Sequence, residues 1–409
     1  MTPKKKNPVL RTRLPTLPPA ARSRVALGLT AAAALGRFEL QQCRDCGSVQ
    51  YPPREACQHC LSIRLAWKPQ SGEGELLAST VLHHSNDLFF RERLPWRLGL
   101  IKLASGPTVV AHLHGAVPAA PAAVRVAARL DRAGQAVLVA HPDKETCDMA
   151  EDRQLREFTC DPKSRKVLVT DGKTGVGQAL VKALAATGSE LIWVGHAEPW
   201  KKLAGFDDLK GIPQVTLVPL DLTDSKNVRE VAAEIGGKVD ILINNAEYHR
   251  AFGIANRHGV ETARAEMDIN YFGLLRLAQE FGPAMRSRGA DGMASAVAWV
   301  NLLSIYALAN YPPHGTFSAS KAAAQSLAQC LRAEMRPAGV RVVNVFPGPI
   351  DDEWNQLVLP PKIAPAALAG AIVKALREGV EDVYPGDVAQ EWLERWRDNP
   401  KALERESAS

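Results

Sequence analysis

The sequence contains no run of apolar residues long enough to cross a bilayer, which takes about 20 of them. The stretch VALGLTAAAALG near the amino terminus is shorter than that and rich in alanine. The basic, proline-rich residues before it lead into no apolar segment with a cleavage site, so we expect no signal peptide. We therefore predict a cytoplasmic protein without membrane contact.

Aromatic side chains are scarce, at 6% of the residues, and internal repeats and low-complexity tracts are absent. The remaining composition, with 46% hydrophobic and 23% charged residues, is that of a globular protein. A length of 409 residues predicts two or three domains. The net charge of +6 lies partly in the basic N-terminal arm, which is more typical of a flexible segment than of a nucleic-acid site. A phosphorylated, acidic substrate would also suit this charge.

Four of the seven cysteines lie in one cluster, and the odd total argues against disulfides in a cytoplasmic chain. Two Cys-x-x-Cys pairs follow each other with ten residues between them. Each pair presents two thiolates to one side of a metal, and the two pairs complete a closed tetrahedral site that suits structural zinc. An iron ion in a rubredoxin-like site is the alternative. The predicted ligands are Cys43, Cys46, Cys57 and Cys60.

The N-terminal part of the chain divides into four segments. Residues 1–37 form a basic arm followed by a short helix rich in alanine and leucine, and residues 38–70 carry the cysteine cluster. Residues 71–142 alternate apolar and polar side chains in short runs separated by turns, which predicts a small all-β barrel. Residues 143–164 are charged, and we interpret them as a linker.

A different pattern begins at residue 165. Short apolar stretches such as KVLVT, VDILINNA and VRVVNVFPG alternate with helical stretches of ten or more residues, and this domain extends over residues 165–392. The alternation predicts a doubly wound, Rossmann-type α/β domain with a parallel sheet between two layers of helices. Residues 393–409 form a charged helical tail. We therefore expect a multidomain chain, in which a metal-binding segment and an all-β barrel precede an α/β domain.

The N-terminal module resembles a known family. The stretches GRFELQQCRDCGSVQYPPREACQHC and LPWRLGLIKLASGPTVVAHLHG are similar to the zinc-ribbon plus OB-fold family associated with acyl-CoA metabolism, and the likeness covers about residues 8–142. It implies a rubredoxin-like zinc ribbon and an OB-fold. Because members of that family commonly accompany thiolases or hydratases, it also implies acyl-CoA and a thiolase-like partner. OB-folds often bind nucleic acid, but these strands offer few aromatic stacking platforms, so nucleic acid is the lesser alternative.

Residues 165–392 resemble the short-chain dehydrogenase/reductase (SDR) family. In TDGKTGVG, residues 170–177, that family has Thr-Gly-x-x-x-Gly-x-Gly, whose glycines let the backbone approach a pyrophosphate. Asp171 replaces the first glycine, and the neighbouring Gly172 is the candidate to take over the turn. The positions that the resemblance assigns to NAD or NADP are Gly172, Gly175, Gly177, Asp221, Asn244, Ala246 and Lys321.

Three departures from the family pattern disfavour dinucleotide binding. Asp171 brings a carboxylate to the phosphate loop, and Glu247 brings another where the Asn-Asn-Ala-Gly motif has its glycine. Asp352 stands where a threonine often binds the carboxamide of the cofactor. Gly195 and His196, after the second strand, indicate neither NAD nor NADP.

The catalytic motif is also altered. Ser304 lies thirteen residues before Phe317, which is the family's spacing between its serine and its catalytic tyrosine, so Phe317 occupies the tyrosine position. A phenyl ring has no proton to give, and loss of a positioned acid costs roughly 100- to 10,000-fold in rate. The catalytic residues that remain, as the resemblance assigns them, are Asn270, Ser304 and Lys321.

We therefore predict an SDR subunit that is inactive alone. The helices expected at 262–286 and 318–335 keep apolar faces, and in this family such helices pair with another subunit. The chain resembles non-catalytic subunits of hetero-oligomeric hydroxyacyl-CoA dehydrogenases, which implies a scaffold in acyl-CoA β-oxidation that joins an active SDR subunit and a thiolase-like protein.

Two alternatives remain beside this prediction. A homodimer formed by the same helices is the alternative assembly. The alternative enzyme is an NAD(P)-dependent oxidoreductase that acts on a hydroxyacyl-CoA with a substitute proton donor. The candidate donors are Tyr306, Tyr311 and His314, although none has the helical relation to Lys321 that places a hydroxyl beside its amine.

Overall fold

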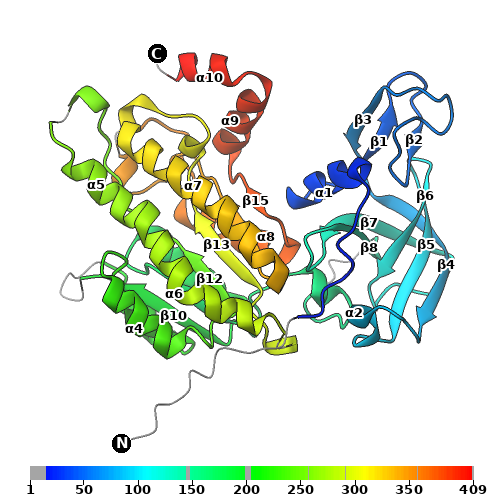
Figure 1. Cartoon of the computed structure of the whole chain (residues 1–409), viewed down its shortest axis with the longest axis horizontal. Helices are drawn as coiled ribbons and strands as arrows, with labels where there is room; N and C mark the ends of the chain where they lie inside the picture. Colours follow the sequence, from blue (N-terminus) through cyan, green and yellow to red (C-terminus); the bar gives the residue numbers. More distant parts are fainter. Residues whose placement is uncertain are drawn as a thin grey trace, which may run out of the picture. The chain divides into compact units, whose positions relative to one another are not determined.

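The computed structural model describes residues 15–143, 148–198, 204–256, 258–290, 292–356 and 358–407. These residues fall into two compact units (Figure 1). The ribbon–barrel unit comprises Thr16–Asp161 together with Ala375–Glu381, and the α/β unit includes Pro162–Lys374 and Asp382–Ser409. The predicted fold class is confirmed, because a cysteine-bearing ribbon and a closed β-barrel precede a parallel α/β sheet. In the part of the chain that is described, no helix is both long enough and apolar enough to cross a membrane.

The ribbon is an antiparallel sheet of three strands in the order β2-β1-β3. A short helix, α1 (Leu27–Ala34), precedes it and buries Leu29 and Ala33. These side chains share one apolar cluster with Leu40 of the ribbon and with the barrel interior, so the ribbon and the barrel have a common core. The strands of the ribbon are β1 (Glu39–Cys43), β2 (Val49–Gln50) and β3 (Leu65–Pro69).

The barrel closes through five strands in the order β4-β5-β6-β8-β7. Closure pairs each strand on both sides and so removes the exposed edges that invite aggregation. Neighbouring strands are antiparallel except β6 and β8, which are parallel. Alternate side chains point into the barrel, where Leu76, Ile101 and Val126 are buried. The strands are β4 (Glu73–Leu82), β5 (Trp96–Leu103), β6 (Thr108–Leu113), β7 (Ala122–Leu130) and β8 (Ala136–Pro142).

A second apolar cluster in the ribbon–barrel unit is built around Trp96. It contains Phe89 of α2 (Leu88–Arg91) and Val139 of β8. Leu155 and Phe158, which begin and end a short 3₁₀ turn, complete it. The charged segment 143–164, expected to be a linker, therefore carries two core side chains of this unit.

The α/β unit is a parallel sheet of seven strands in the order β11-β10-β9-β12-β13-β14-β15. The strand order reverses between β9 and β12, and such a switch point leaves a crevice outside the carboxyl ends of the two strands. The strands are β9 (Lys166–Val169), β10 (Leu191–His196), β11 (Val215–Pro219), β12 (Ile241–Asn244), β13 (Ala298–Leu302), β14 (Arg341–Val345) and β15 (Asp382–Val383).

Helices α5 and α6 follow one another along one line, and α7 lies beside both of them and packs on β14 of this sheet (Figure 1). A π-helical segment, Asp268–Gly273, joins α5 to α6, and interruptions of this kind are frequent at functional sites. The predicted tail, residues 393–409, contains the end of one helix and the whole of another. The helices of the unit are α3 (Gly175–Ala186), α4 (Ser225–Ile235), α5 (Glu261–Met267), α6 (Leu274–Ser287), α7 (Gly315–Met335), α8 (Pro365–Glu378), α9 (Asp387–Asp398) and α10 (Pro400–Glu406).

Candidate functional site

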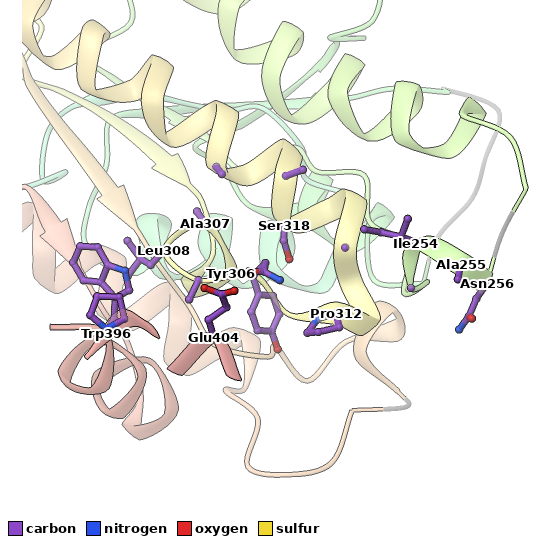
Figure 2. Close-up of a pocket in the computed structure, with 17 residues that line it drawn as sticks. Ile254, Ala255, Asn256, Tyr306, Ala307, Leu308, Pro312, Ser318, Trp396 and Glu404 are labelled. Carbon is purple, nitrogen blue, oxygen red and sulfur yellow. The ribbon is translucent and has the colours of Figure 1, made fainter. Parts of the chain in front are cut away.

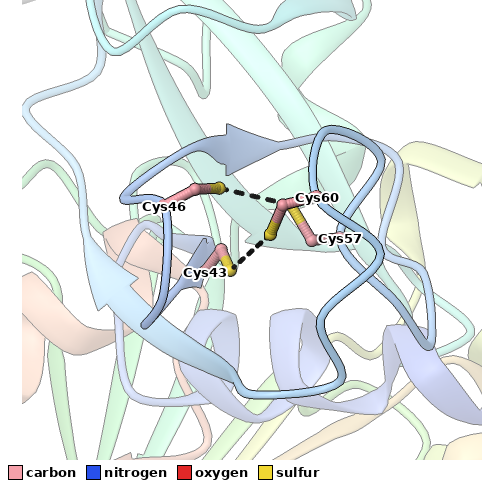
Figure 3. Close-up of side chains that lie close together, drawn as sticks. All are labelled: Cys43, Cys46, Cys57 and Cys60. Atoms are coloured by element: carbon pink, nitrogen blue, oxygen red, sulfur yellow. Dashed lines mark hydrogen bonds between the residues drawn. The ribbon is translucent and has the colours of Figure 1, made fainter.

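The four cysteines of the ribbon converge on one point (Figure 3). Their sulfur atoms all lie within 4.8 Å of one another, and the Cys43–Cys60 and Cys46–Cys57 sulfurs are 3.6 Å apart. Tetrahedral zinc with Zn–S bonds of about 2.3 Å would separate its ligand sulfurs by about 3.8 Å. The predicted ligand set is therefore brought together, and its geometry is consistent with structural zinc.

The two cysteine pairs lie in two separate turns that have the same backbone hydrogen bond. The N–H of Asp45 is 3.4 Å from the Cys43 sulfur, and the N–H of His59 is 3.4 Å from the Cys57 sulfur. Backbone hydrogen bonding, foremost from Cys46, lowers the pKa of Cys43 to about 7. Because the thiolate is the form that binds metal, the lowered pKa of Cys43 and of Cys57 favours metal binding by these two sulfurs.

The loop after β9 keeps the tight packing of a dinucleotide fold. A Cβ atom at Gly177 would come 1.9 Å from the carbonyl oxygen of Asp171, and one at Gly172 would come 2.0 Å from a side chain of β10. Helix α3 begins at Gly175, and Thr174 caps it by accepting a hydrogen bond from the N–H of Gly177 at 3.1 Å. Two of the three predicted glycines are therefore required by local packing alone.

Asp171 turns back onto its own loop. Its carboxylate accepts a hydrogen bond from the N–H of Lys173 at 2.8 Å. The Asn245 side chain holds the Asp171 backbone twice, by accepting from its N–H at 3.0 Å and donating to its carbonyl at 2.6 Å. Burial raises the pKa of Asp171, and the negative charge of Glu247 adds to that shift.

The remaining predicted cofactor positions are engaged in local hydrogen bonds. Asp221 accepts from both the N–H and the hydroxyl of Thr223, at 2.9 and 2.7 Å. Thr170 Oγ1 donates to the Asn244 side chain at 3.3 Å and accepts from the N–H of Ala246 at 3.1 Å. These bonds tie the end of β12 to the end of β9.

Lys321 and Glu247 form a buried ion pair at the switch point. The ammonium of Lys321 lies 2.7 Å from the Glu247 carboxylate, and the side chains are 2% and 13% exposed. The same ammonium donates to the carbonyl of Leu302, at the end of β13, at 2.9 Å. The cation that the SDR resemblance assigns to a ribose is thus bound to a carboxylate of its own chain.

Phe317 lies under an imidazole that the sequence analysis did not single out. The ring of His249 stacks on the Phe317 ring with centroids 3.9 Å apart and planes 18° apart. Its Nε2 is 3.0 Å from Nδ1 of His314, and both histidines are buried. Phe317 is itself only 3% exposed. Its ring therefore faces the His249–His314 pair rather than solvent.

Asn270 and Ser304 are both bonded to backbone. Asn270 accepts from the N–H of Tyr248 at 3.0 Å, donates to the Tyr248 carbonyl at 2.9 Å and donates to Ser320 at 2.8 Å. Ser304 accepts from the N–H of Tyr306 at 3.2 Å and so caps the turn after β13. Each of the two side chains thus has a structural role in the crevice.

Sequence reasoning also missed Tyr248, Arg250 and Trp354. The guanidinium of Arg250 lies 4.6 Å from the Tyr248 ring and 4.4 Å from the Trp354 ring. The signal was present in the stretch EYHR, four large polar or aromatic residues directly after the Asn-Asn-Ala motif. What could not be read from it is which distant residues these four contact.

A pocket of about 710 Å³ opens beside the first turns of α7 (Figure 2). Its walls come from the 253–256 segment, from Tyr306 and its neighbours, and from Trp396 and the start of α10. Neither Phe317 nor Lys321 lines it, so this pocket is separate from the crevice that holds the ion pair.

Comparison with protein families divides the chain in the same way. Residues 165–360 match the model described as short chain dehydrogenase. Residues 30–64 match the ChsH2 rubredoxin-like zinc ribbon domain, and residues 67–135 match the ChsH2 C-terminal OB-fold domain. The protein is a fusion of a ChsH2-type zinc ribbon and OB-fold with an SDR domain.

Solved structures extend the family match. A short chain dehydrogenase from Burkholderia cenocepacia J2315, solved in complex with NADP, is 35% identical and aligns with a TM-score of 0.55. The alignment covers 61% of this chain and 99% of that one. A short-chain dehydrogenase from Streptomyces avermitilis is 26% identical, with a TM-score of 0.52 and coverage of 60% and 96%. The chain therefore belongs to the short-chain dehydrogenase family.

Among curated proteins, dehydrogenase/reductase SDR family member 7B of Mus musculus is 34% identical over 190 residues. That alignment covers 44% of this chain and 56% of the mouse protein. Family member 7C of Xenopus tropicalis is 32% identical over 45% of this chain and 60% of its own length. The chain thus spans somewhat more than half the length of these relatives.

Proposed function

We propose that this chain is a catalytically degenerate SDR-fold subunit that holds partners together. The partners are an active 3-hydroxyacyl-CoA dehydrogenase of SDR fold and a thiolase-like protein, both in acyl-CoA β-oxidation. The observation that carries the proposal is the buried phenyl ring of Phe317 at the position of the family's proton donor. Without an acid at this point, hydride transfer has no coupled proton transfer.

Three titratable groups near Phe317, namely His249, His314 and Tyr306, have a pKa that does not suit the role of the missing tyrosine. Burial lowers the pKa of His249 and of His314 to about 4, so at neutral pH their acid forms are scarcely populated. Burial raises the pKa of Tyr306 and makes it a weaker acid than a free tyrosine. A general acid works best when its pKa lies near the working pH, and all three depart from it.

The outer face of α5 and of the π-helical segment supports the pairing with an SDR subunit. Val260 and Phe272 are 51% and 43% exposed there. Both line a shallow hollow of about 550 Å³ together with Met267. Obligate contacts bury roughly 2,000 Å² or more and are rich in apolar side chains, and this face offers such side chains to a partner.

The barrel surface supports the contact with a thiolase-like partner. Leu77, Leu100 and Val110 are 47%, 41% and 55% exposed. Leu100 of β5 pairs with Ala78 of β4 and with Val110 of β6, so the apolar patch crosses three adjacent strands. Contiguous apolar patches on a surface typically mark interaction sites.

Turnover of the purified chain tests the catalytic half of the proposal. With a 3-hydroxyacyl-CoA and either NAD or NADP, we expect no appreciable reduction of the nicotinamide, measured by absorbance. Restoring the acid in the double variant Phe317→Tyr/Glu247→Gly is expected to raise the rate by roughly 100-fold or more over background. Ordinary dehydrogenase rates in the wild type, abolished by Lys321→Ala, would refute the proposal.

The second candidate is a self-sufficient NAD(P)-dependent oxidoreductase acting on a hydroxyacyl-CoA. The NADP bound by the Burkholderia relative favours it. In this case the proton would pass through the His249–His314 pair, of which His249 stacks on the Phe317 ring. The same assay decides, because this candidate requires turnover that His314→Ala eliminates.

A further inference from the structure

We infer that the segment Glu247–Arg250 is a built-in occupant of the SDR crevice, so that this chain does not take the dinucleotide its relatives bind. The inference deepens the proposed function and rests on it for the identity of the crevice. The four consecutive residues of this segment are held by side chains from elsewhere in the α/β unit, on α7, the π-helical segment, α5 and the turn at Trp354. We call this segment the plug.

The plug starts at the point where the strand order reverses. Glu247 lies three residues after the end of β12, and Asp171 lies two residues after the end of β9. Ligands of open α/β sheets bind in the crevice outside these carboxyl ends. The two carboxylates act on each other through space, which contributes to the raised pKa of Asp171. A pyrophosphate would add its own negative charges to this place.

The positive charges beside the two carboxylates are already engaged. Lys321, 2% exposed, is bound by the Glu247 carboxylate and by the Leu302 carbonyl. Lys173, 8% exposed, donates to the carbonyl of Glu198. A ligand that took the place of Glu247 would leave a carboxylate without its partner in a buried site, which is strongly unfavourable.

The rest of the plug is fixed rather than free to swing aside. The backbone of Tyr248 is bonded through both its N–H and its carbonyl to Asn270 in the π-helical segment. His249 stacks on Phe317 of α7. Arg250 lies within cation–π distance of Tyr248 and Trp354 and donates its N–H to Glu266 at 3.0 Å. Removal of the plug would break contacts with four elements, namely the π-helical segment, α7, α5 and the turn that contains Trp354.

Dinucleotide binding tests the inference without relying on turnover. Energy transfer from tryptophan to NADH and to NADPH, with calorimetry as the second method, is measured on the full chain. For the wild type we expect no saturable binding up to about 1 mM. For Glu247→Gly we expect binding at least about tenfold tighter than that limit.

Two further variants serve as comparisons in this test. Glu247→Gln keeps the size of the side chain but removes its charge, so intermediate binding would separate repulsion from bulk. Glu261→Gln removes a carboxylate from the start of α5 outside the crevice and is expected to leave binding undetectable. Circular dichroism establishes that each variant is folded.

The inference is overturned if the wild type binds either dinucleotide saturably with a dissociation constant below about 1 mM. It is also overturned if both folded Glu247 variants still fail to bind. A wild type that binds but shows no turnover would end this inference and leave the proposed function standing. Turnover by the wild type would end both.

Discussion

The two candidate sites of this protein present opposite arrangements of their charged and reactive side chains. In the ribbon, four sulfur atoms face one common centre, and thiol contacts of 3.6 Å join them in two pairs. In the crevice of the α/β unit, an ammonium and a carboxylate face each other at 2.7 Å. The first arrangement is consistent with a structural zinc site, whereas the charges of the second are paired within the chain.

The difference shows how internal contacts can distinguish a fold that still offers a ligand site from one whose site is occupied by its own side chains. The glycines of the phosphate loop are retained, but packing against Asp171 and β10 is enough to require them. The cysteines of the ribbon have no such packing reason for their number and spacing. Retained motif residues are therefore a weaker sign of ligand binding than side chains of one ligand type that converge on a common centre.

The largest expected effect concerns the ribbon. Binding of structural zinc contributes on the order of 10–16 kcal/mol to folding, so Cys57→Ser should unfold the ribbon and reduce the metal content from one ion per chain to none. Metal analysis by mass spectrometry and circular dichroism measure the two outcomes. Cys330→Ser, at an exposed position on α7, is the control. A well-folded wild-type protein without zinc or iron would contradict the prediction that the ribbon binds a structural metal ion.

The next effect concerns the crevice. Lys321→Met leaves the Glu247 carboxylate without its cation in a site where it is only 13% exposed, and removal of one partner of a buried pair costs about 3–5 kcal/mol. Urea unfolding measures it. Lys226→Met, which breaks an exposed pair with Glu230, should cost less than about 1 kcal/mol. If the two variants are equally stable, the crevice pair does not stabilise the fold.

Adding Glu247→Gln to Lys321→Met sharpens this result. Because the double variant no longer buries an unpaired charge, it should recover part of the lost stability. The difference between the double variant and the sum of the single ones gives the coupling of the pair. Strict additivity would contradict the contact.

A smaller effect is expected where the α/β unit still offers apolar side chains to a partner. Phe272→Asp, on the exposed face of the π-helical segment, should weaken association with an SDR subunit by more than about tenfold, measured by mass photometry of co-expressed chains. Lys226→Asp on α4 is the control. Leu331 is unsuitable for this test, because it is 5% exposed and belongs to the core. If only homodimers form and Phe272→Asp leaves them intact, this face is not the contact.

The smallest effect is a dependence on pH. The pKa of His249 and of His314 is about 4 in the folded chain, below the value of about 6.5 expected when unfolded. The unfolded chain therefore binds more protons between these values, and stability falls as the pH drops through this window. Between about pH 7 and pH 5.5 each imidazole should cost about 1 kcal/mol.

His314→Phe is expected to flatten this pH profile, measured by thermal unfolding at several pH values. The exposed His258→Phe should leave it unchanged. A profile of the same steepness in His314→Phe would show that the buried histidines are not its source.

Sequence alone predicted what depends on local spacing. The two Cys-x-x-Cys pairs gave the ribbon site, because four ligands on two short turns need no long-range information. The alternation of apolar strands and helices gave the parallel sheet, and the spacing from Ser304 gave the place of Phe317. Each of these features is fixed by residues close together in the chain.

What the sequence did not disclose depends on partners far apart in the chain. Glu247 could be recognised as foreign to its motif, but its bond to Lys321 joins β12 to α7 across more than seventy residues. The contact of Arg250 with Trp354 spans a longer separation still. Glu247, which in the sequence looked like the loss of a motif residue, therefore forms an ion pair with Lys321. Only the three-dimensional structure distinguishes the loss of a residue from the gain of a contact.

The membership of Ala375–Glu381 in the ribbon–barrel unit has a consequence for dissecting the protein. The N–H of Cys160 donates to Leu376 at 2.9 Å, and the N–H of Glu381 donates to Ala34 at 2.8 Å. A polypeptide ending at Asp161 would lack both acceptor and donor, together with the buried side chain of Leu376. The ribbon–barrel unit is discontinuous in the sequence, because residues 375–381 belong to it although the α/β unit lies on both sides of them. A single proteolytic cut therefore cannot release either unit intact.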